Sequence, residues 1–266
     1  MSSLLEKWYG GPPCEHFQSD EFLREFGVCA IGTLVVYLFF SQSGLIDTSK
    51  DDNKRKQTRI GYILTTWIAV YTFCAVIIWW YHNWNEDLDV AMYRSDWLGR
   101  NACTMQLAYF VIDCLFMHFV YPLTADFQSW FHHIMFFGFM GSALYMDCTN
   151  IFLLFFVVEL PTAILGIGRM WPSQRRDITF QVTFFLCRIV YHIYLISVLY
   201  RTYDSSPMTT AFGGSCASFL LHCSWFYTVI SKQYFQKGSG KSMTAEDSST
   251  YRFLSKEDKN AEEKNA

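Results

Sequence analysis

Apolar residues in this chain are gathered into long runs that short polar segments separate. An α-helix needs about 20 predominantly apolar residues to cross the hydrocarbon core of a bilayer, and each run is close to that length. None of the runs alternates apolar and polar residues with the period of two that barrel strands show. The pattern predicts an all-α polytopic membrane bundle of about seven transmembrane helices, at residues 26–43, 60–81, 102–121, 129–146, 149–167, 178–200 and 209–231.

The polar segments divide the chain into three parts. Residues 1–59 combine an N-terminus that we expect to be lumenal, the first transmembrane helix and a basic cytosolic loop. Residues 60–232 form a six-helix membrane domain, and the polar composition of residues 233–266 predicts a disordered cytosolic tail. Only Asp147 and Cys148 separate the fourth run from the fifth, which predicts a very tight hairpin.

Lysine and arginine are distributed unequally between the two sides of the predicted bundle. Five of them (Lys7, Arg24, Arg94, Arg100 and Arg201) lie near the helix ends on one side. The other side carries eleven: Lys50, Lys54, Arg55, Lys56, Arg59, Arg169, Arg175, Arg176, Lys232, Lys237 and Lys241. The positive-inside rule places the richer side in the cytosol, so the N-terminus is expected to be lumenal or extracellular and the C-terminus cytosolic.

Composition agrees with a membrane location and excludes one class of function. Charged residues make up 17% of the chain, against about a quarter in a typical soluble domain, while hydrophobic residues make up 52% and aromatic residues 19%. The formal net charge of -3 gives no basic face for nucleic acid. Nine cysteines without a CxxC pair imply no disulfide framework, although one bridge among Cys14, Cys103 and Cys148 stays open.

Four ionisable residues lie inside the apolar runs, where a charged group is costly unless it is paired or wetted. Asp113, Glu159, Arg188 and His222 each lie about nine residues from the predicted cytosolic end of their helix, which places them in one layer. Two interpretations stay open. The residues form a functional polar cluster, or Arg188 is a structural staple that holds the third, fifth and sixth helices together. Either way, we expect Arg188 to approach Glu159 or Asp113.

A second group of ionisable residues lies nearer the predicted cytosolic surface. His118 is in the third helix, and His132 and His133 begin the fourth. Adjacent residues on a helix point about 100° apart, so at most one of the pair is expected to face the same space as His118. A wetted histidine near neutral pH can act as general base or nucleophile, while the alternative is a purely anchoring role. The chain lacks the closely spaced histidine boxes of a di-iron enzyme, and no metal site is predicted.

The order of these polar landmarks resembles the TLC domain, the region shared by ceramide synthases, TRAM proteins and further multipass proteins. The resemblance rests on four segments from about residue 61 to residue 232: LAYFVIDCLF, WFHHIMFF, FFVVELPTAIL and FFLCRIVYHIYL. It covers the second to the seventh predicted helix. Ceramide synthases carry a His-Asp motif after the histidine pair, whereas this chain has Glu159-Leu160-Pro161-Thr162 there. The chain is therefore more similar to the TLC domain-containing branch that is linked to membrane lipid composition.

The resemblance implies a lipid-related function and a set of site residues. It implies binding or processing of a fatty-acyl or sphingolipid molecule, with acyl-CoA as a co-substrate of a ceramide synthase-like N-acyltransferase and no bound cofactor. It assigns catalytic roles to four residues: Asp113, His132, His133 and Glu159. Four more are expected to bind substrate or to complete a structural cluster: His118, Arg188, His192 and His222.

Other functions compete with this expectation. A non-enzymatic regulator of lipid composition, or a chaperone for lipid or cargo, fits the same resemblance. A seven-helix receptor agrees only in helix count and orientation, because the chain has HFVYPL and CSWFYTVI where receptors carry their DRY-like and NPxxY motifs. No inverted repeat with paired broken helices indicates a transporter. The family resemblance favours the endoplasmic reticulum membrane, with the plasma membrane and the Golgi as alternatives, and leaves the oligomeric state unassigned.

Overall fold

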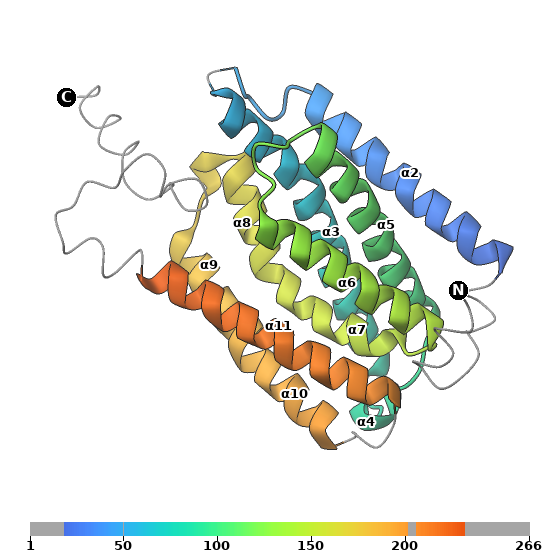
Figure 1. Ribbon diagram of the computed structural model, residues 1–266. Coiled ribbons are helices and arrows are strands. Elements are labelled where there is room, and N and C mark those ends of the chain that lie inside the picture. Colours follow the sequence, from blue (N-terminus) through green and yellow to red (C-terminus); the bar gives the residue numbers. More distant parts are fainter. Residues whose placement is uncertain (1–18, 50, 202–205, 232–266) are drawn as a thin grey trace. The chain divides into compact units, whose positions relative to one another are not determined.

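The computed structural model describes residues 19–49, 51–201 and 206–231, and these residues contain helices but no strand (Figure 1). The long helices are α2 (Asp20–Gln42), α3 (Asn53–Asn83), α5 (Trp97–Phe119), α6 (Phe127–Tyr145) and α11 (Ser206–Ile230). Two further runs are built from several pieces. One comprises α7 (Thr149–Phe155), η1 (Phe156–Glu159) and α8 (Leu160–Met170), and the other α9 (Asp177–Phe184), η3 (Phe185–Val190) and α10 (Tyr191–Arg201). The remaining short elements are α4 (Leu88–Ala91) and η2 (Pro172–Gln174).

Helices occupy all seven places that the apolar runs predict. Within the described residues, five helical segments are long and apolar enough to cross a membrane: α2, α3, α5, Thr149–Met170 and Asp177–Arg201. Helices α6 and α11 are not among them. The chain is therefore an integral membrane helical bundle, and the fourth and seventh predicted crossings, at residues 129–146 and 209–231, stay predictions.

Aspartate and serine side chains start several of these helices. The side chain of Ser19 accepts a hydrogen bond from the Phe22 N–H at the start of α2. Asp52, Asp96 and Asp126 do the same at the start of α3, α5 and α6. Such caps satisfy backbone donors that have no partner within the helix, so each of these polar residues fixes where an apolar run begins.

The hairpin between α6 and α7 is as tight as the sequence predicts. Met146, Asp147 and Cys148 alone connect the two helices. Asp147 has a φ angle of 51°, in the left-handed region that aspartate tolerates better than most residues. The turn reverses the direction of the chain, and α6 and α7 contact each other.

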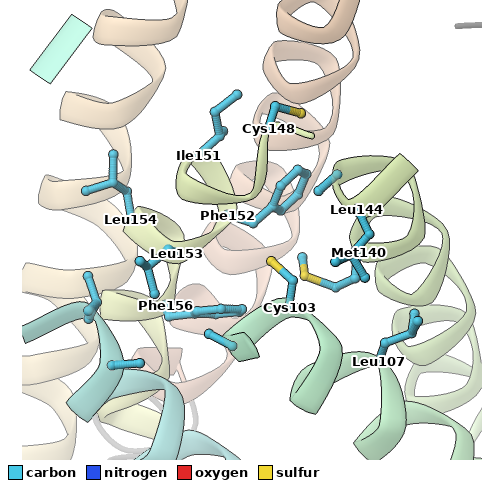
Figure 2. Close-up of a cluster of buried hydrophobic side chains, with 14 of the residues drawn as sticks. Cys103, Leu107, Met140, Leu144, Cys148, Ile151, Phe152, Leu153, Leu154 and Phe156 are labelled. Atoms are coloured by element: carbon cyan, nitrogen blue, oxygen red, sulfur yellow. The ribbon is translucent and has the colours of Figure 1, made fainter. Parts of the chain in front are cut away.

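Helix α3 packs against α2, α5, α7 and α8, and α5 packs against α2, α3, α6 and α7. Gly166 brings α8 close to α3, because a Cβ atom at this position would overlap the Thr66 hydroxyl. Figure 2 shows the apolar side chains that fill the space between α5, α6 and α7, including Cys103, Met140 and Phe152. Cys103 and Cys148 are both free thiols, and Cys14 lies outside the described residues.

Two helices lose their regular geometry at the level of Arg188. Pro161 lacks the N–H that would continue the helix, and the turn before it, η1, is a 3₁₀ segment. On the other run, η3 is a π-helical segment that carries Arg188. The two irregular segments contact each other. Segments of this kind are frequent at functional sites and hinges.

A buried polar network closes the end of the bundle where α5 begins; we call it the Asn150 network. The Asn150 amide donates to the Ala91 carbonyl (3.1 Å) and to Asp96 Oδ2 (3.2 Å). Asp96 also accepts from the Trp79 indole (2.7 Å) and from the Gly99 N–H (2.7 Å). The network therefore joins α3, the segment before α5 and α7 through one amide and one carboxylate.

The chain divides at Phe219 into two compact units. Residues up to Phe219 form the first, to which all contacts above belong. The second, from Leu220, includes the end of α11, where the rings of His222 and Trp225 are 5.7 Å apart. The predicted tail, 233–266, lies outside the described residues.

Candidate functional site

The end of α5 and the start of α6 bring two of the predicted residues together. Asp113 lies six residues before the last residue of α5, and His133 lies six residues after the first residue of α6. At about 1.5 Å per residue, each is roughly 9 Å inside the same end of the bundle. Both side chains are buried, with 4% of Asp113 and 8% of His133 exposed. Two ionisable groups are thus withdrawn from water in adjacent helices.

His133 and Asp113 form a direct pair. Nε2 of His133 lies 3.1 Å from Oδ2 of Asp113. Nδ1 of the same ring lies 2.9 Å from the backbone carbonyl of Ser129, one turn back along α6. Because a carbonyl only accepts, the Nδ1 atom carries a hydrogen. The second nitrogen, Nε2, is the ring atom that faces the Asp113 carboxylate.

Tyr109 extends the pair toward α3. Its hydroxyl lies 3.3 Å from Nε2 of His133 and 3.3 Å from the hydroxyl of Thr65. Thr65 donates in turn to the Gly61 carbonyl (3.4 Å). A continuous chain of hydrogen bonds thus runs from α3 through α5 to α6.

Tyr121 covers the other oxygen of Asp113. Its hydroxyl donates to Oδ1, and its ring packs beside Gly61. Burial, and then the charge of Asp113, raise the pKa of Tyr121, so this phenol keeps its proton at neutral pH. The loop that carries Tyr121 is tied to α3 by a bond from the Leu123 N–H to Gln57 Oε1 (3.0 Å). We call Asp113, His133, Tyr109, Tyr121 and Thr65 the His133 network.

His132 has a different environment from its neighbour. Its ring lies among Phe110, Phe136 and His133, with centroids at 6.4, 4.6 and 5.6 Å. The side chain is half-buried, and the positive charge of Arg188 is close enough to act on it. The two histidines therefore point to different neighbours, as the rotation of about 100° per residue predicts.

The expectation that both histidines are wetted at the cytosolic mouth is wrong for His133. Its imidazole is buried against α5 because α6 turns this face toward Asp113 and Phe110. The substitution His133→Ala would leave the Asp113 carboxylate buried without its histidine partner. Such a variant therefore tests folding as well as function.

Arg188 reaches the broken helix rather than a carboxylate. Its Nε donates to the Val158 carbonyl (2.9 Å) and its Nη2 to the Thr162 hydroxyl (2.6 Å). Within the described chain, no ion pair joins Arg188 to Glu159 or Asp113, so the expected pair is wrong in its partner. The Val158 carbonyl that accepts from Arg188 lies in η1, the 3₁₀ segment before Pro161.

Glu159 belongs to the surroundings of the network without bonding to the histidines. It is half-buried at the end of η1, and its charge acts on Tyr109. In the described part of the chain it forms no hydrogen bond or ion pair with His132 or His133. The predicted layer of Asp113, Glu159 and Arg188 is therefore a group of neighbours, of which only Asp113 is paired with a histidine.

Three other predicted residues are not brought to this network. His118 is exposed and its ring lies against Phe119 (4.5 Å). His192 is fully buried between α10 and α11, where Nε2 lies 3.1 Å from the carbonyl and from the hydroxyl of Ser215. His222 belongs to the second unit, where its side chain is buried and its ring lies 5.7 Å from that of Trp225.

Sequence reasoning missed Tyr109, Tyr121 and Thr65. Tyr109 precedes Asp113 by four residues on α5, so helical spacing could have placed both on one face. Tyr121 follows the helix in a loop, and Thr65 is on another helix; their contacts with the network depend on tertiary packing, and the sequence carries no local signal for them. Among the described residues, no group of three or more His, Cys, Asp or Glu side chains could hold a metal ion.

The class of protein follows from these observations: an integral membrane bundle of helices with a buried network of ionisable side chains near one end. The family model of the TLC domain matches residues 58–231. This match covers more than half of the chain, and the protein belongs to the TLC domain family. Neither the curated proteins nor the solved structures contain a match.

Proposed function

We propose that this protein binds a membrane lipid within its helical bundle and acts on the lipid at the His133 network. The observation that carries the proposal is the buried His133–Asp113 pair, whose atoms are 3.1 Å apart. Ionisable side chains within a membrane bundle are expensive and mark functional sites by default. A TLC domain with such a pair is compatible with a lipid-related membrane function.

The chemistry available at the network is proton transfer. Nε2 of His133 contacts both a carboxylate and a phenol, and the neighbouring His132 is a second imidazole. General acid and base groups of this kind assist acyl transfer to an amine or a hydroxyl. The proposed substrate class is a fatty-acyl or sphingoid lipid, with acyl-CoA as the acyl donor, in line with the family resemblance.

A non-enzymatic role in regulating lipid composition is the second candidate. The observation that favours it is the position of Glu159, which occupies the segment where ceramide synthases carry acidic residues and yet forms no bond with either histidine within the described chain. In that case the polar network recognises a lipid headgroup and performs no reaction. If the protein transfers an acyl group, loss of the histidines changes lipid amounts by slowing turnover. If it only recognises a lipid, their loss acts through binding alone.

We also propose an orientation and a location. The lysine and arginine bias supports a lumenal N-terminus and a cytosolic C-terminus, so the His133 network lies near the cytosolic side. The family resemblance supports the endoplasmic reticulum. Protease protection with a tag at each end tests the orientation: an N-terminal tag that is digested from the cytosolic side contradicts it.

Untargeted lipid mass spectrometry tests the proposed function. Cells that lack the protein are complemented with wild type, with the double variant His132→Ala, His133→Gln, or with His82→Ala. His82 is an exposed histidine near the other end of α3, so its loss controls for histidine content. Glutamine keeps a polar partner for Asp113, which protects folding. If the network catalyses a reaction, the double variant is expected to lower turnover by about a hundredfold, so that the lipid profile resembles that of cells without the protein.

At matched amounts of folded protein, His82→Ala should restore the wild-type profile. If the double variant also restores that profile, His132 and His133 take no part in a reaction. Lipid recognition or regulation then becomes the better account. If wild type does not change the lipid profile of the deficient cells at all, both forms of the proposal fail.

A further inference from the structure

The two ends of the bundle carry opposite charge among the described residues. The end where α3 begins and α8 ends has seven cations: Lys54, Arg55, Lys56, Arg59, Arg169, Arg175 and Arg176. It has five carboxylates: Asp47, Asp51, Asp52, Asp126 and Asp177. The end where α5 begins has four cations (Arg24, Arg94, Arg100 and Arg201) and eight carboxylates (Asp20, Glu21, Glu25, Glu86, Asp87, Asp89, Asp96 and Asp147). The first end is therefore positive and the second negative.

Part of the positive charge at the first end is compensated within the protein. Three arginines lie close to carboxylates: Arg55 to Asp52 (3.7 Å), Arg59 to Asp51 (3.2 Å) and Arg175 to Asp177 (2.6 Å). Arg169 is buried, and its guanidinium lies over the ring of Tyr62, 5.6 Å from the centroid. These four cations are therefore engaged by neighbouring side chains.

The other three cations at this end are Lys54, Lys56 and Arg176, which we call the basic surface. All three are exposed. Within the described residues, no carboxylate forms an ion pair with any of them. Arg176 donates to the Arg175 carbonyl (3.4 Å), but a neutral carbonyl does not cancel its charge. The basic surface therefore presents uncompensated positive charge to its surroundings, and such charge attracts anions.

The end of α8 joins the two parts of the basic surface. Arg169, near the end of α8, lies over Tyr62, which follows Lys56 by six residues on α3. Gly168 brings α8 close to the segment before α9, because a Cβ atom there would lie 3.3 Å from the Cα atom of Arg175. The start of α3 and the segment before α9 therefore lie at the same end of the bundle.

Neighbouring apolar and aromatic side chains indicate the depth of the basic surface in a membrane. Ile178, two residues after Arg176, is 75% exposed, as expected for a side chain that faces hydrocarbon. Trp171 is half-buried, and its indole donates to the Leu45 carbonyl (2.9 Å). Tryptophan is typical of the membrane interface. Cations just outside the apolar part of a membrane helix lie within reach of lipid headgroups.

We infer that Lys54, Lys56 and Arg176 bind the anionic headgroups of phospholipids in the leaflet at this end of the bundle. Charge complementarity carries the inference, because the three cations are exposed, uncompensated and placed beside the apolar surface. Phospholipid headgroups surround an integral membrane protein at this level, whereas a soluble anion has to be captured from solution. This binding surface is separate from the His133 network and does not depend on any reaction there.

The test measures lipid selectivity with the full-length protein in phosphatidylcholine vesicles. A trace of spin-labelled phosphatidylserine or spin-labelled phosphatidylcholine is added, and electron paramagnetic resonance gives the fraction of each that the protein immobilises. The ratio of the two association constants is the selectivity. One Lys or Arg near an anionic lipid is worth about a fivefold change in binding, so wild type should prefer phosphatidylserine by about fivefold or more.

The triple variant Lys54→Gln, Lys56→Gln, Arg176→Gln should bring this selectivity close to one. The three side chains are exposed, so their loss should leave folding intact. The matched control removes the same amount of charge from the other end, with Arg24→Gln, Arg94→Gln and Arg201→Gln. These three arginines are also exposed, and the control should keep the wild-type selectivity.

Salt provides a second measurement on the wild-type protein. Raising the salt concentration to about 1 M shortens the screening length to about 3 Å, so the selectivity should fall. Coenzyme A, compared with sodium chloride at equal ionic strength, serves as a soluble phosphate probe. It should lower the selectivity no more than the chloride does.

Equal association of the two lipids with wild type at low salt would overturn the inference. So would a triple variant with wild-type selectivity, or an equal loss in the control. A loss caused by coenzyme A and not by chloride would assign the basic surface to a soluble phosphate ligand and reject the lipid. All these measurements are made without a reaction, so failure of the proposed lipid chemistry leaves their outcome unchanged.

Discussion

The two polar networks of this bundle lie on the same helix and differ in what their groups can do. The Asn150 network surrounds the start of α5, and the His133 network lies near its end, about 25 Å away at 1.5 Å per residue. Asn150 and Asp113 are both buried, with 2% and 4% exposed. The polar atoms of Asn150 bond to the Ala91 carbonyl, to Asp96 and to the Asp96 N–H. Those of Asp113 bond to tyrosine and histidine side chains.

The difference teaches how to separate structural from functional polar groups inside a membrane bundle. An amide that bonds to backbone groups of two segments cannot change its charge, so it can only hold these segments together. A carboxylate paired with an imidazole can gain or lose a proton, which a purely structural contact does not need. We therefore expect the Asn150 amide to serve stability, while the His133 network is the site of the proposed function.

Substitution of Asn150 by Leu should have the largest effect on stability. The change keeps the size of the side chain but leaves the Ala91 carbonyl and the Asp96 N–H buried without their partner. Each buried unsatisfied group costs about 1–3 kcal/mol, so the free energy of unfolding should fall by about 3 kcal/mol. Thermal unfolding of detergent-solubilised protein measures it.

Asn83→Ala is the control for this substitution. Asn83 is half-buried at the end of α3, and its amide donates to the Trp79 carbonyl of the same helix (2.8 Å). We expect a loss below about 1 kcal/mol. Equal midpoints for Asn150→Leu and Asn83→Ala would show that the Asn150 network does not hold the segments together.

Substitution of Gly99 by Ala should have the next largest effect. A Cβ atom here would overlap the Asn150 amide oxygen and would lie 2.8 Å from the Thr149 hydroxyl. Because the Asn150 amide oxygen belongs to the Asn150 network, the overlap displaces the network at a cost of about 1–3 kcal/mol. Gly138→Ala on α6 has nothing within 4 Å of the added atom and should be neutral or slightly stabilising. A Gly99→Ala protein that unfolds at the same temperature as Gly138→Ala argues against this close packing.

The smallest expected effect concerns the thiol of Cys148, in the turn beside the Asn150 network. Burial, and then the charge of Asp147, raise its pKa from 9.0 to about 12. The thiolate is the reactive form, so the native protein should resist maleimide between pH 7 and about pH 9, and unfolding should restore labelling. Mass spectrometry of the peptide that contains Cys148 measures this. Fast labelling of the native protein at pH 7 would show that this turn opens readily.

The sequence alone predicts the helices well because each has an apolar run of the length that a bilayer requires. It also predicts Asp113 and His133 as candidates, since ionisable residues are rare in such runs. It does not predict the partners of these residues. Arg188 bonds to Val158 and Thr162, on either side of Pro161, and only the folded chain shows this. The loop residue Tyr121 is likewise brought to Asp113 by tertiary packing.

The central claim is that the charge of Asp113 serves function, and Asp113→Asn tests it most directly. The amide keeps the shape of the side chain and can still accept from Tyr121, but it removes the carboxylate that faces Nε2 of His133. The measurement is the lipid composition of deficient cells complemented with this variant at the wild-type amount of folded protein. The account predicts a profile like that of cells without the protein, since the acid or base step should slow by about a hundredfold or more. A wild-type profile from Asp113→Asn would contradict it.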